Sequence, residues 1–304
     1  MNEPQPKLEL YRVRDMGQMM GFAANLVRRH YKHMFKTIGL MSLPLMLMAS
    51  TLYYLGTAAV WEGFDPALGQ MRTNPVNMNM FLAYIAIYFT YSAILWGTVY
   101  YVKLYQEKGP ENFQWNDIWA KVFAHGWWLL LSNILIFLII GILAALSFLL
   151  VFTVILAPVS FLLFAGLIAM SQVWTVVYLY EAKGLFVAFE RCLKLLKKQW
   201  FKAIALLICS YMVVSGFIML PAFIGLIGAM MGGNIGVEEI FSQDNLWLLL
   251  LIQNLSTILS FFTTFFLSLS FTAFYLSNVE RLEKVSLKAR VEKLSEDSTL
   301  SSYS

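Results

Sequence analysis

The stretch that decides the fold runs from Gly126 to Tyr180 and reads GWWLLLSNILIFLIIGILAALSFLLVFTVILAPVSFLLFAGLIAMSQVWTVVYLY. Its 55 residues contain no Asp, Glu, Lys or Arg. One straight helix of that length would measure about 80 Å, whereas the core of a bilayer is about 30 Å thick. The chain must therefore fold back. Pro158 marks the place, because proline is tolerated in the first turn of a helix but not in its interior. We predict two spans, near 127–149 and 157–180.

Four further charge-free runs flank this stretch. They are Thr37–Trp61, Thr73–Val102, Ala203–Val237 and Asn245–Val279. Each is long enough to cross a bilayer as one helix, which needs about 20 apolar residues. The helix that contains Pro221 is long enough that it must tilt, kink at this proline or end early. The sequence therefore predicts an all-α fold with six transmembrane helices, arranged as three hairpins.

The composition excludes an ordinary cytosolic enzyme and a disordered chain. Of the 304 residues, 59% are hydrophobic and 13% are charged, and the mean hydropathy is +0.66. Soluble globular proteins carry roughly 25% charged and 45–50% apolar residues. With only 2 cysteines, the chain has no disulfide framework.

The distribution of Lys and Arg along the chain predicts its orientation. Residues 1–36 carry seven of them, 102–126 three, 180–202 six and 277–304 five. The two remaining loops, 61–78 and 232–245, carry only Arg72, so 21 of the 22 basic residues are predicted to share one side. Because cytoplasmic loops are enriched in basic residues, we expect both termini in the cytoplasm.

Three parts of the chain follow from this topology. Residues 1–36 form a cytoplasmic N-terminal segment with an amphipathic helix, 37–279 form the transmembrane domain, and 280–304 form a cytoplasmic tail. The first 36 residues lack the apolar core of a signal peptide, so we expect the first span to serve as the anchor.

Each hairpin is preceded by a segment that is expected to form an amphipathic helix at the cytoplasmic membrane surface: residues 19–36, 115–127 and 184–200. In the last of these, the apolar residues recur at helical spacing and form one stripe, which ends at Trp200. Basic residues occupy the remaining faces of two of these helices, and we predict that they contact anionic lipid or a partner protein. Together with Trp200 they are Arg28, Arg29, Lys32, Arg191, Lys194, Lys197 and Lys198.

Residues 180–200 resemble a known bacterial pattern. An acidic residue ends a span, a glycine follows, and Ala, Arg, Leu, Lys and Trp recur before the next span. The matching residues are Glu181, Gly184, Ala188, Arg191, Leu195, Lys197 and Trp200. This order is similar to that of a six-span family that includes the membrane domain of glycerophosphoryl diester phosphodiesterases. The resemblance covers about 20 residues and implies a bacterial cytoplasmic membrane. It implies no hydrolase activity, because a catalytic barrel needs about 250 residues and no soluble stretch exceeds the first 36.

Glu181 also has a predicted structural role. It lies just ahead of the 184–200 helix, so its carboxylate is expected to meet the N-terminal amides of that helix, an interaction typically worth about 0.3–1 kcal/mol. A solvated loop charge is the alternative.

No motif for catalysis or cofactor binding is present. The chain lacks HExxH, Gly-x-Ser-x-Gly, a P-loop and CxxC. The predicted spans contain no charged residue, which argues against a proton-coupled carrier. His30 and His33 have no acidic or Cys partner nearby in the sequence, so a solvated surface is favoured over a metal site. We expect no enzyme, no cofactor, no metal and no nucleic-acid partner.

The predicted function is a non-enzymatic scaffold or partner subunit of a membrane complex. The last span carries hydroxyls near helical spacing, at Ser256, Ser260, Thr263 and Ser270, with Thr264 as a further candidate member of the stripe. Hydrogen bonding between helices is the structural interpretation of this stripe, and a substrate path is the functional one. A permease for a small neutral or lipidic solute is therefore the alternative function.

Overall fold

The computed structural model describes residues 9–62, 64–65, 70–71, 78–110, 112–149, 157–182, 184–231, 246–288 and 291–292. These residues are helical apart from short connections and one antiparallel pair of two-residue strands, Phe64–Asp65 (β1) and Gln70–Met71 (β2). The prediction of an all-α fold is confirmed. The predicted loop 232–245 lies outside the described residues.

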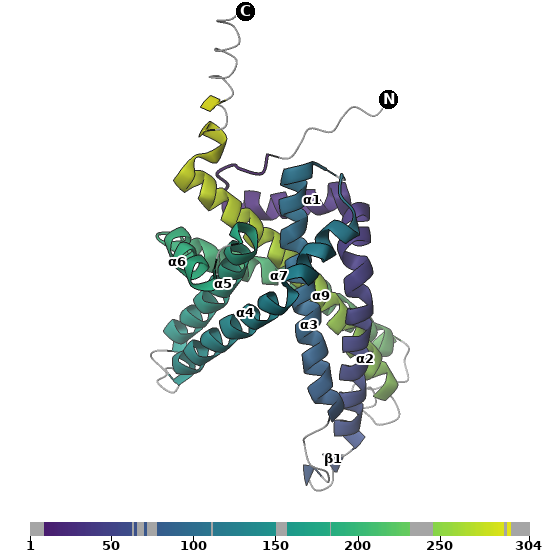
Figure 1. Ribbon diagram of the computed structural model, residues 1–304. Helices are drawn as coiled ribbons and strands as arrows, with labels where there is room; N and C mark the ends of the chain where they lie inside the picture. The colour runs from purple at the N-terminus through teal and green to yellow at the C-terminus, as the bar shows by residue number, and fades with distance from the viewer. Residues whose placement is uncertain are drawn as a thin grey trace, which may run out of the picture. The chain divides into compact units, whose positions relative to one another are not determined.

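Nine helices are described, and Figure 1 draws them along the chain. They are α1 Met16–Met34, the π-helical turn η1 Phe35–Gly39, α2 Leu40–Glu62, α3 Met78–Lys108, α4 Trp115–Leu149, α5 Ala157–Glu181, α6 Leu185–Leu196, α7 Trp200–Met231 and α9 Leu246–Glu283.

Three described helices are long and apolar enough to cross a membrane by themselves. They are Met78–Lys108, Pro158–Glu181 and Leu259–Glu283. Two bent pairs raise the number to five if each pair is one span: Met16–Gly39 with Ser42–Thr57, and Leu185–Leu196 with Trp200–Gly216. Helices of this length and apolarity indicate a membrane protein, and the count of six spans stays a prediction.

The long charge-free stretch is divided into two helices at the predicted place. α4 ends at Leu149 and α5 begins at Ala157, so Pro158 lies in the first turn of α5. α4 and α5 contact each other and run side by side (Figure 1). The second proline, Pro221, falls within α7, where its side chain is outside the described residues.

One predicted helix boundary is wrong. We expected a separate amphipathic helix over 115–127, but α4 runs unbroken from Trp115 to Leu149. Gly126 is the only residue near the expected boundary that disfavours a helix, and a glycine there costs only about 1 kcal/mol relative to alanine. That cost is too small to end a helix by itself.

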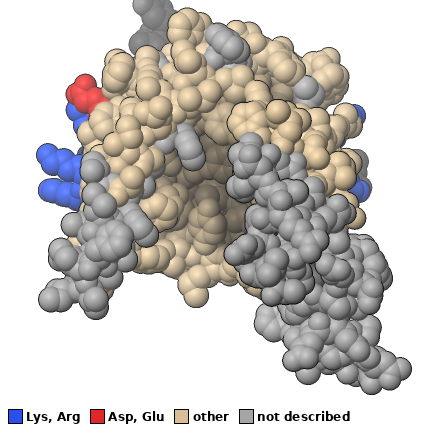
Figure 2. Space-filling model, turned by 90° about the horizontal axis from the view of Figure 1, so that it is seen from below, with Lys and Arg blue, Asp and Glu red and all other residues tan. Residues whose placement is uncertain are grey.

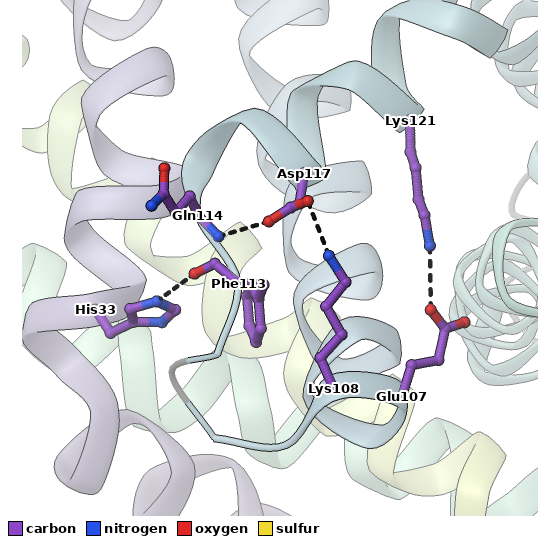
Figure 3. A network of polar contacts seen from close by, with 7 residues as sticks. All are labelled: His33, Glu107, Lys108, Phe113, Gln114, Asp117 and Lys121. Atoms are coloured by element: carbon purple, nitrogen blue, oxygen red, sulfur yellow. Dashed lines mark hydrogen bonds and ion pairs between the residues drawn. The ribbon is translucent and has the colours of Figure 1, made fainter.

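The start of α4 is fixed by Asp117, the third residue of the helix. Its Oδ2 accepts a hydrogen bond from the backbone N–H of Gln114 at 2.7 Å, and its Oδ1 accepts one from Lys108 Nζ at 2.9 Å (Figure 3). A carboxylate at this position satisfies an amide that the helix itself leaves without an acceptor. The hydrogen bond from the Gln114 N–H lowers the pKa of Asp117 the most, and the one from Lys108 lowers it further, so the pKa lies below its usual range.

Three helices end on a residue in the left-handed conformation. Gly109 (φ 88°) follows α3, Ala182 (φ 51°) follows α5 and Lys284 (φ 53°) follows α9. In each case the residue's N–H still bonds the carbonyl four residues earlier, at 2.9–3.1 Å. This arrangement is a common helix C-terminus, in which glycine is the usual residue.

The chain forms two compact units. One consists of Met34–Thr98 and Cys209–Leu267. In this unit α2 and α3 run side by side towards β1 (Figure 1), and Met46 and Ala49 of α2 pack with Ala86 and Ile94 of α3 and with Phe261 of α9. The two backbones approach closely: a Cβ added at Gly56 would lie 3.0 Å from the backbone of Met80.

The other unit consists of Met1–His33, Val99–Ile208 and Ser268–Ser304, and it holds the C-terminal ends of α3 and α9. α3 has 31 residues and α9 has 38, so they measure about 46 and 57 Å, well above the roughly 30 Å of a bilayer core. Their C-terminal turns, 99–105 and 268–280, are almost fully buried. These turns form the core of the unit that carries the candidate site.

The predicted helix 184–200 ends four residues early. α6 stops at Leu196, and α7 begins at Trp200 after a turn at which the helix axis bends by 95°. Lys198 takes a φ of 66° in this turn, and Gln199 N–H bonds Leu196 O at 2.7 Å. The turn contains neither Gly nor Pro, so the sequence gives no signal for it.

Charged side chains are sparse on the face that Figure 2 shows. The described atoms there are almost all uncharged, and the Lys, Arg, Asp and Glu side chains in view lie at its edges. Uncharged helical surface of this kind suits contact with lipid.

Candidate functional site

The candidate site is built on α6, which packs against α5. The indole Nε1 of Trp174 donates to Leu185 O at 3.0 Å, and its ring lies 4.6 Å from that of Phe189. One turn further on, Cys192 is fully buried with its Sγ 3.6 Å from Met170 O. Most of the predicted apolar stripe of α6 therefore faces α5, and Leu193 is the member of the stripe that is exposed.

Trp200 belongs to the same packed surface. Its ring lies 3.6 Å from the position that a Cβ at Gly166 of α5 would occupy, and the side chain is half-buried. We predicted Trp200 as a lipid- or partner-binding residue, and the structure places its ring on α5. Gly184, the N-cap of α6, is exposed and has no atom within 4 Å of an added Cβ.

Arg191 lies between two carboxylates. Its Nε donates to Glu181 Oε1 at 3.1 Å, and its Nη2 donates to Glu283 Oε1. Glu181 Oε1 also accepts a hydrogen bond from Tyr275 OH at 3.1 Å. The side chains of Arg191 and Glu181 are 24% and 12% exposed, and that of Glu283 is 38% exposed. This group, which we call the Arg191 cluster, joins the C-terminal ends of α5 and α9 to α6.

The structure gives Glu181 two hydrogen bonds that were not predicted. They come from Arg191 and Tyr275, and the contact with the first-turn amides of α6 stays a prediction. The sequence analysis singled out both Glu181 and Arg191, because both belong to the bacterial pattern over residues 180–200, but it did not pair them. A separation of ten residues across a non-helical connection follows no helical periodicity, so their contact was not anticipated.

Beside Arg191, a row of lysines is exposed. Lys194 is 63% exposed and contacts Glu190 at 2.7 Å, and Lys197 and Lys198 are exposed at the end of the helix. Large apolar side chains are exposed on the same helix and at the start of α7. They are Phe186 (74%), Val187 (54%), Leu193 (41%) and Phe201 (81%). We call the three lysines and these four apolar residues together the exposed face of α6.

The basic residues of α1 form a second exposed group. Arg28, Arg29 and Lys32 are all exposed, and Lys32 Nζ lies 5.8 Å from the centre of the Tyr31 ring. The opposite side of α1 is buried through Met19, Phe22, Ala23 and Leu26, which recur at helical spacing. α1 is therefore amphipathic, as predicted for residues 19–36.

The segment that precedes α1 was not anticipated as part of the site. Arg14 is 6% exposed: its N–H donates to Ser277 Oγ at 2.9 Å, its carbonyl accepts from Lys202 Nζ at 2.7 Å, and its guanidinium donates to carbonyls of residues 9–12. Burial lowers the pKa of Arg14, although a guanidinium stays charged at neutral pH. Tyr11 and Tyr180 both donate to Gln106 Oε1, which links this segment to α3 and α5.

The two histidines of α1 are packed rather than solvated. His33 Nε2 lies 2.8 Å from Phe113 O (Figure 3), and its Nδ1 lies 3.1 Å from Tyr101 OH. The carbonyl can only accept, so Nε2 carries the proton. The His30 ring meets that of Tyr105 edge-on at 5.3 Å. No group of three or more His, Cys, Asp or Glu side chains suited to a metal occurs among the described residues.

Comparison with known proteins gave no match: no family model, no curated protein and no solved structure is similar to this chain.

Proposed function

We propose that the chain is a six-span membrane protein of a bacterial cytoplasmic membrane, with both termini in the cytoplasm, and that it acts as a non-enzymatic scaffold or partner subunit. In this proposal its basic surface helices contact anionic lipid. One observation carries it: the exposed face of α6 combines Lys194, Lys197 and Lys198 with four exposed apolar side chains.

This combination is typical of a helix that lies in the membrane surface. Apolar side chains enter the boundary of the acyl chains, and basic side chains meet the phosphates. Near an anionic leaflet each exposed basic residue contributes on the order of 1 kcal/mol at low salt. Arg191 has a different role, because its charge is already matched by two carboxylates of the protein.

The test uses the full-length protein in a neutral detergent. Phosphatidylglycerol is titrated in, and the lipid retained per protein is measured by native mass spectrometry. Changing Lys194, Lys197 and Lys198 together to Gln should weaken retention by roughly 3 kcal/mol at low salt. A matched variant removes three other lysines, Lys108, Lys121 and Lys288, and should lose much less. Equal losses in the two triple variants would contradict the proposal.

The six-span topology has its own test. In a background in which Cys192 and Cys209 are replaced by Ser, single cysteines at Asn74 and Asn234 should react with an impermeant thiol reagent in intact cells. Cysteines at Asn116 and Lys288 should react only after lysis. The reverse pattern would overturn the proposed orientation.

A permease is the second candidate, and two buried hydroxyls favour it. Ser210 Oγ in α7 and Thr263 Oγ1 in α9 are buried without a hydrogen-bond partner among the described residues. Thr263 belongs to the predicted polar stripe, whereas Thr264 and Thr272 bond carbonyls of their own helix. A permease should move a neutral solute when reconstituted alone. A scaffold should be inert until its partner, recovered from native membranes, is added.

A further inference from the structure

The two carboxylates that hold Arg191 differ in how firmly they are bound. Glu181 also accepts a hydrogen bond from Tyr275 and is only 12% exposed. Glu283 is 38% exposed, and Arg191 is the only hydrogen-bond partner that the described residues provide for it. Of the two, Glu283 is therefore the carboxylate that another anion can replace.

Arg191 lies within reach of a lipid phosphate held by the exposed face of α6. Lys194 follows it by three residues, which places the two side chains next to each other on the helix surface. A guanidinium has five N–H donors in a planar fork, and it binds phosphate and carboxylate in the same geometry. The donor at stake is Nη2 of Arg191, which bonds Glu283, the more exposed of the two carboxylates.

The local charge also opposes lipid binding while Glu283 stays in place. Glu181, Arg191 and Glu283 together carry one net negative charge. Without Glu283 the cluster is neutral, and Arg191 can add its donors to those of the lysines. From these contacts we infer that Glu283 is an intramolecular competitor of the lipid phosphate for Arg191. The inference rests on the proposed contact of α6 with anionic lipid.

Displacing Glu283 would act on the C-terminal end of α9. Glu283 is the last residue of this helix, and Lys284 follows in the left-handed conformation. The next turn is held by Glu280, whose Oε2 accepts the Ser286 N–H at 2.9 Å and whose Oε1 accepts the Ser286 hydroxyl. Binding of lipid at α6 would thereby loosen the chain at Lys284, the residue at which α9 ends, which we call the Lys284 joint.

The test compares two changes of equal charge in the full-length protein. Glu283→Gln frees Arg191, and Glu190→Gln frees Lys194, which it contacts at 2.7 Å. Each removes one negative charge and should raise phosphatidylglycerol affinity about fivefold at low salt. In the Arg191→Gln background the gain from Glu283→Gln should shrink to the part that comes from the removed charge alone, whereas the gain from Glu190→Gln should persist in full.

A second measurement covers the case in which Glu283→Gln does not fold. A spin label at Leu287, an exposed residue beyond the joint, is placed in the otherwise unchanged protein after Cys192 and Cys209 are replaced by Ser. Phosphatidylglycerol should increase the mobility of this label, and phosphatidylcholine should not. Inorganic phosphate at equal concentration should have a small effect, because it lacks the acyl chains that seat the headgroup on α6.

The outcomes separate the inference from the proposed function. Suppose that the triple lysine variant loses lipid, but that Glu283→Gln has no effect on lipid affinity or has the same effect with and without Arg191. The inferred competition between Glu283 and lipid is then wrong, and the proposed contact of α6 with lipid stands. If the triple lysine variant retains lipid like its control, the lipid contact itself fails. An unchanged Leu287 label on adding phosphatidylglycerol would also overturn the coupling.

Discussion

Replacing Asp117 by Ala removes two contacts from the start of α4 at once. The backbone N–H of Gln114 loses its acceptor, and Lys108 loses its partner (Figure 3). Loss of a capping side chain costs about 1 kcal/mol. The ion pair, in which Lys108 is 44% and Asp117 35% exposed, adds about 0.2–1 kcal/mol. The first turn of α4 should therefore open about 1.5 kcal/mol more easily.

Hydrogen exchange of the full-length protein in detergent measures this opening directly. The amides of residues 114–119 should exchange about tenfold faster in Asp117→Ala than in the wild type, whereas the middle of α4 should be unaffected. Glu107→Gln is the matched control. It breaks the neighbouring contact with Lys121 at 3.2 Å and leaves the helix start intact. Equal exchange of residues 114–119 in the two variants would refute the capping argument.

The same contact predicts a pH dependence. Because the folded protein lowers the pKa of Asp117, its contribution to stability is fully present above the ordinary value near 4. This contribution is lost as the pH falls through the lowered pKa that Asp117 has in the folded protein. At pH 7 the wild type and Asp117→Ala should differ in exchange at residues 114–119. The difference should shrink only below about pH 4, and a difference that disappears between pH 7 and 5 would point to another group.

Two further predictions concern packing and the Arg191 cluster, both measured as thermal unfolding in detergent. Gly56→Ala should lower stability by about 1–3 kcal/mol, because its Cβ would lie 3.0 Å from backbone atoms of Met80, whereas Gly166→Ala, with ordinary contacts at 3.5 and 3.6 Å, should be nearly neutral. Similar effects of the two variants would contradict the close approach of α2 and α3. Arg191→Ala and Glu181→Gln should show a coupling of about 0.5–3 kcal/mol in a double-mutant cycle, and additive effects would show that their contact contributes nothing.

The sequence predicts most of the helices because their signals are local. A run of 55 residues without charge is too long for one transmembrane helix and requires two. Pro158 indicates where the second helix begins, because proline is tolerated in the first turn of a helix. The break between α6 and α7 has no such signal. Lys198 takes a left-handed conformation that a residue other than glycine rarely adopts, and Cys192 and Trp200, on the two sides of the turn, both pack on α5.

The candidate site was predicted less completely for a related reason. Counting basic residues placed Arg191 and Lys194 in one group, because both lie on the polar part of one helix. They differ in their partners: Arg191 contacts Glu283, 92 residues away, and Lys194 contacts Glu190 on its own helix. A single sequence holds no information on which distant carboxylate reaches α6.

The partners of α6 also set an order of assembly during synthesis. Its contacts with Trp174 and Met170 join residues 11 to 22 positions apart, so α6 can settle on α5 as soon as both have left the ribosome. The bond from Arg191 to Glu283 must wait until all of α7 and α9 has been made. Until then Glu181 alone neutralises Arg191, and the guanidinium Nη2 lacks the carboxylate that it bonds in the finished protein. The last residue of α9 thus closes a structure that began to form about a hundred residues earlier.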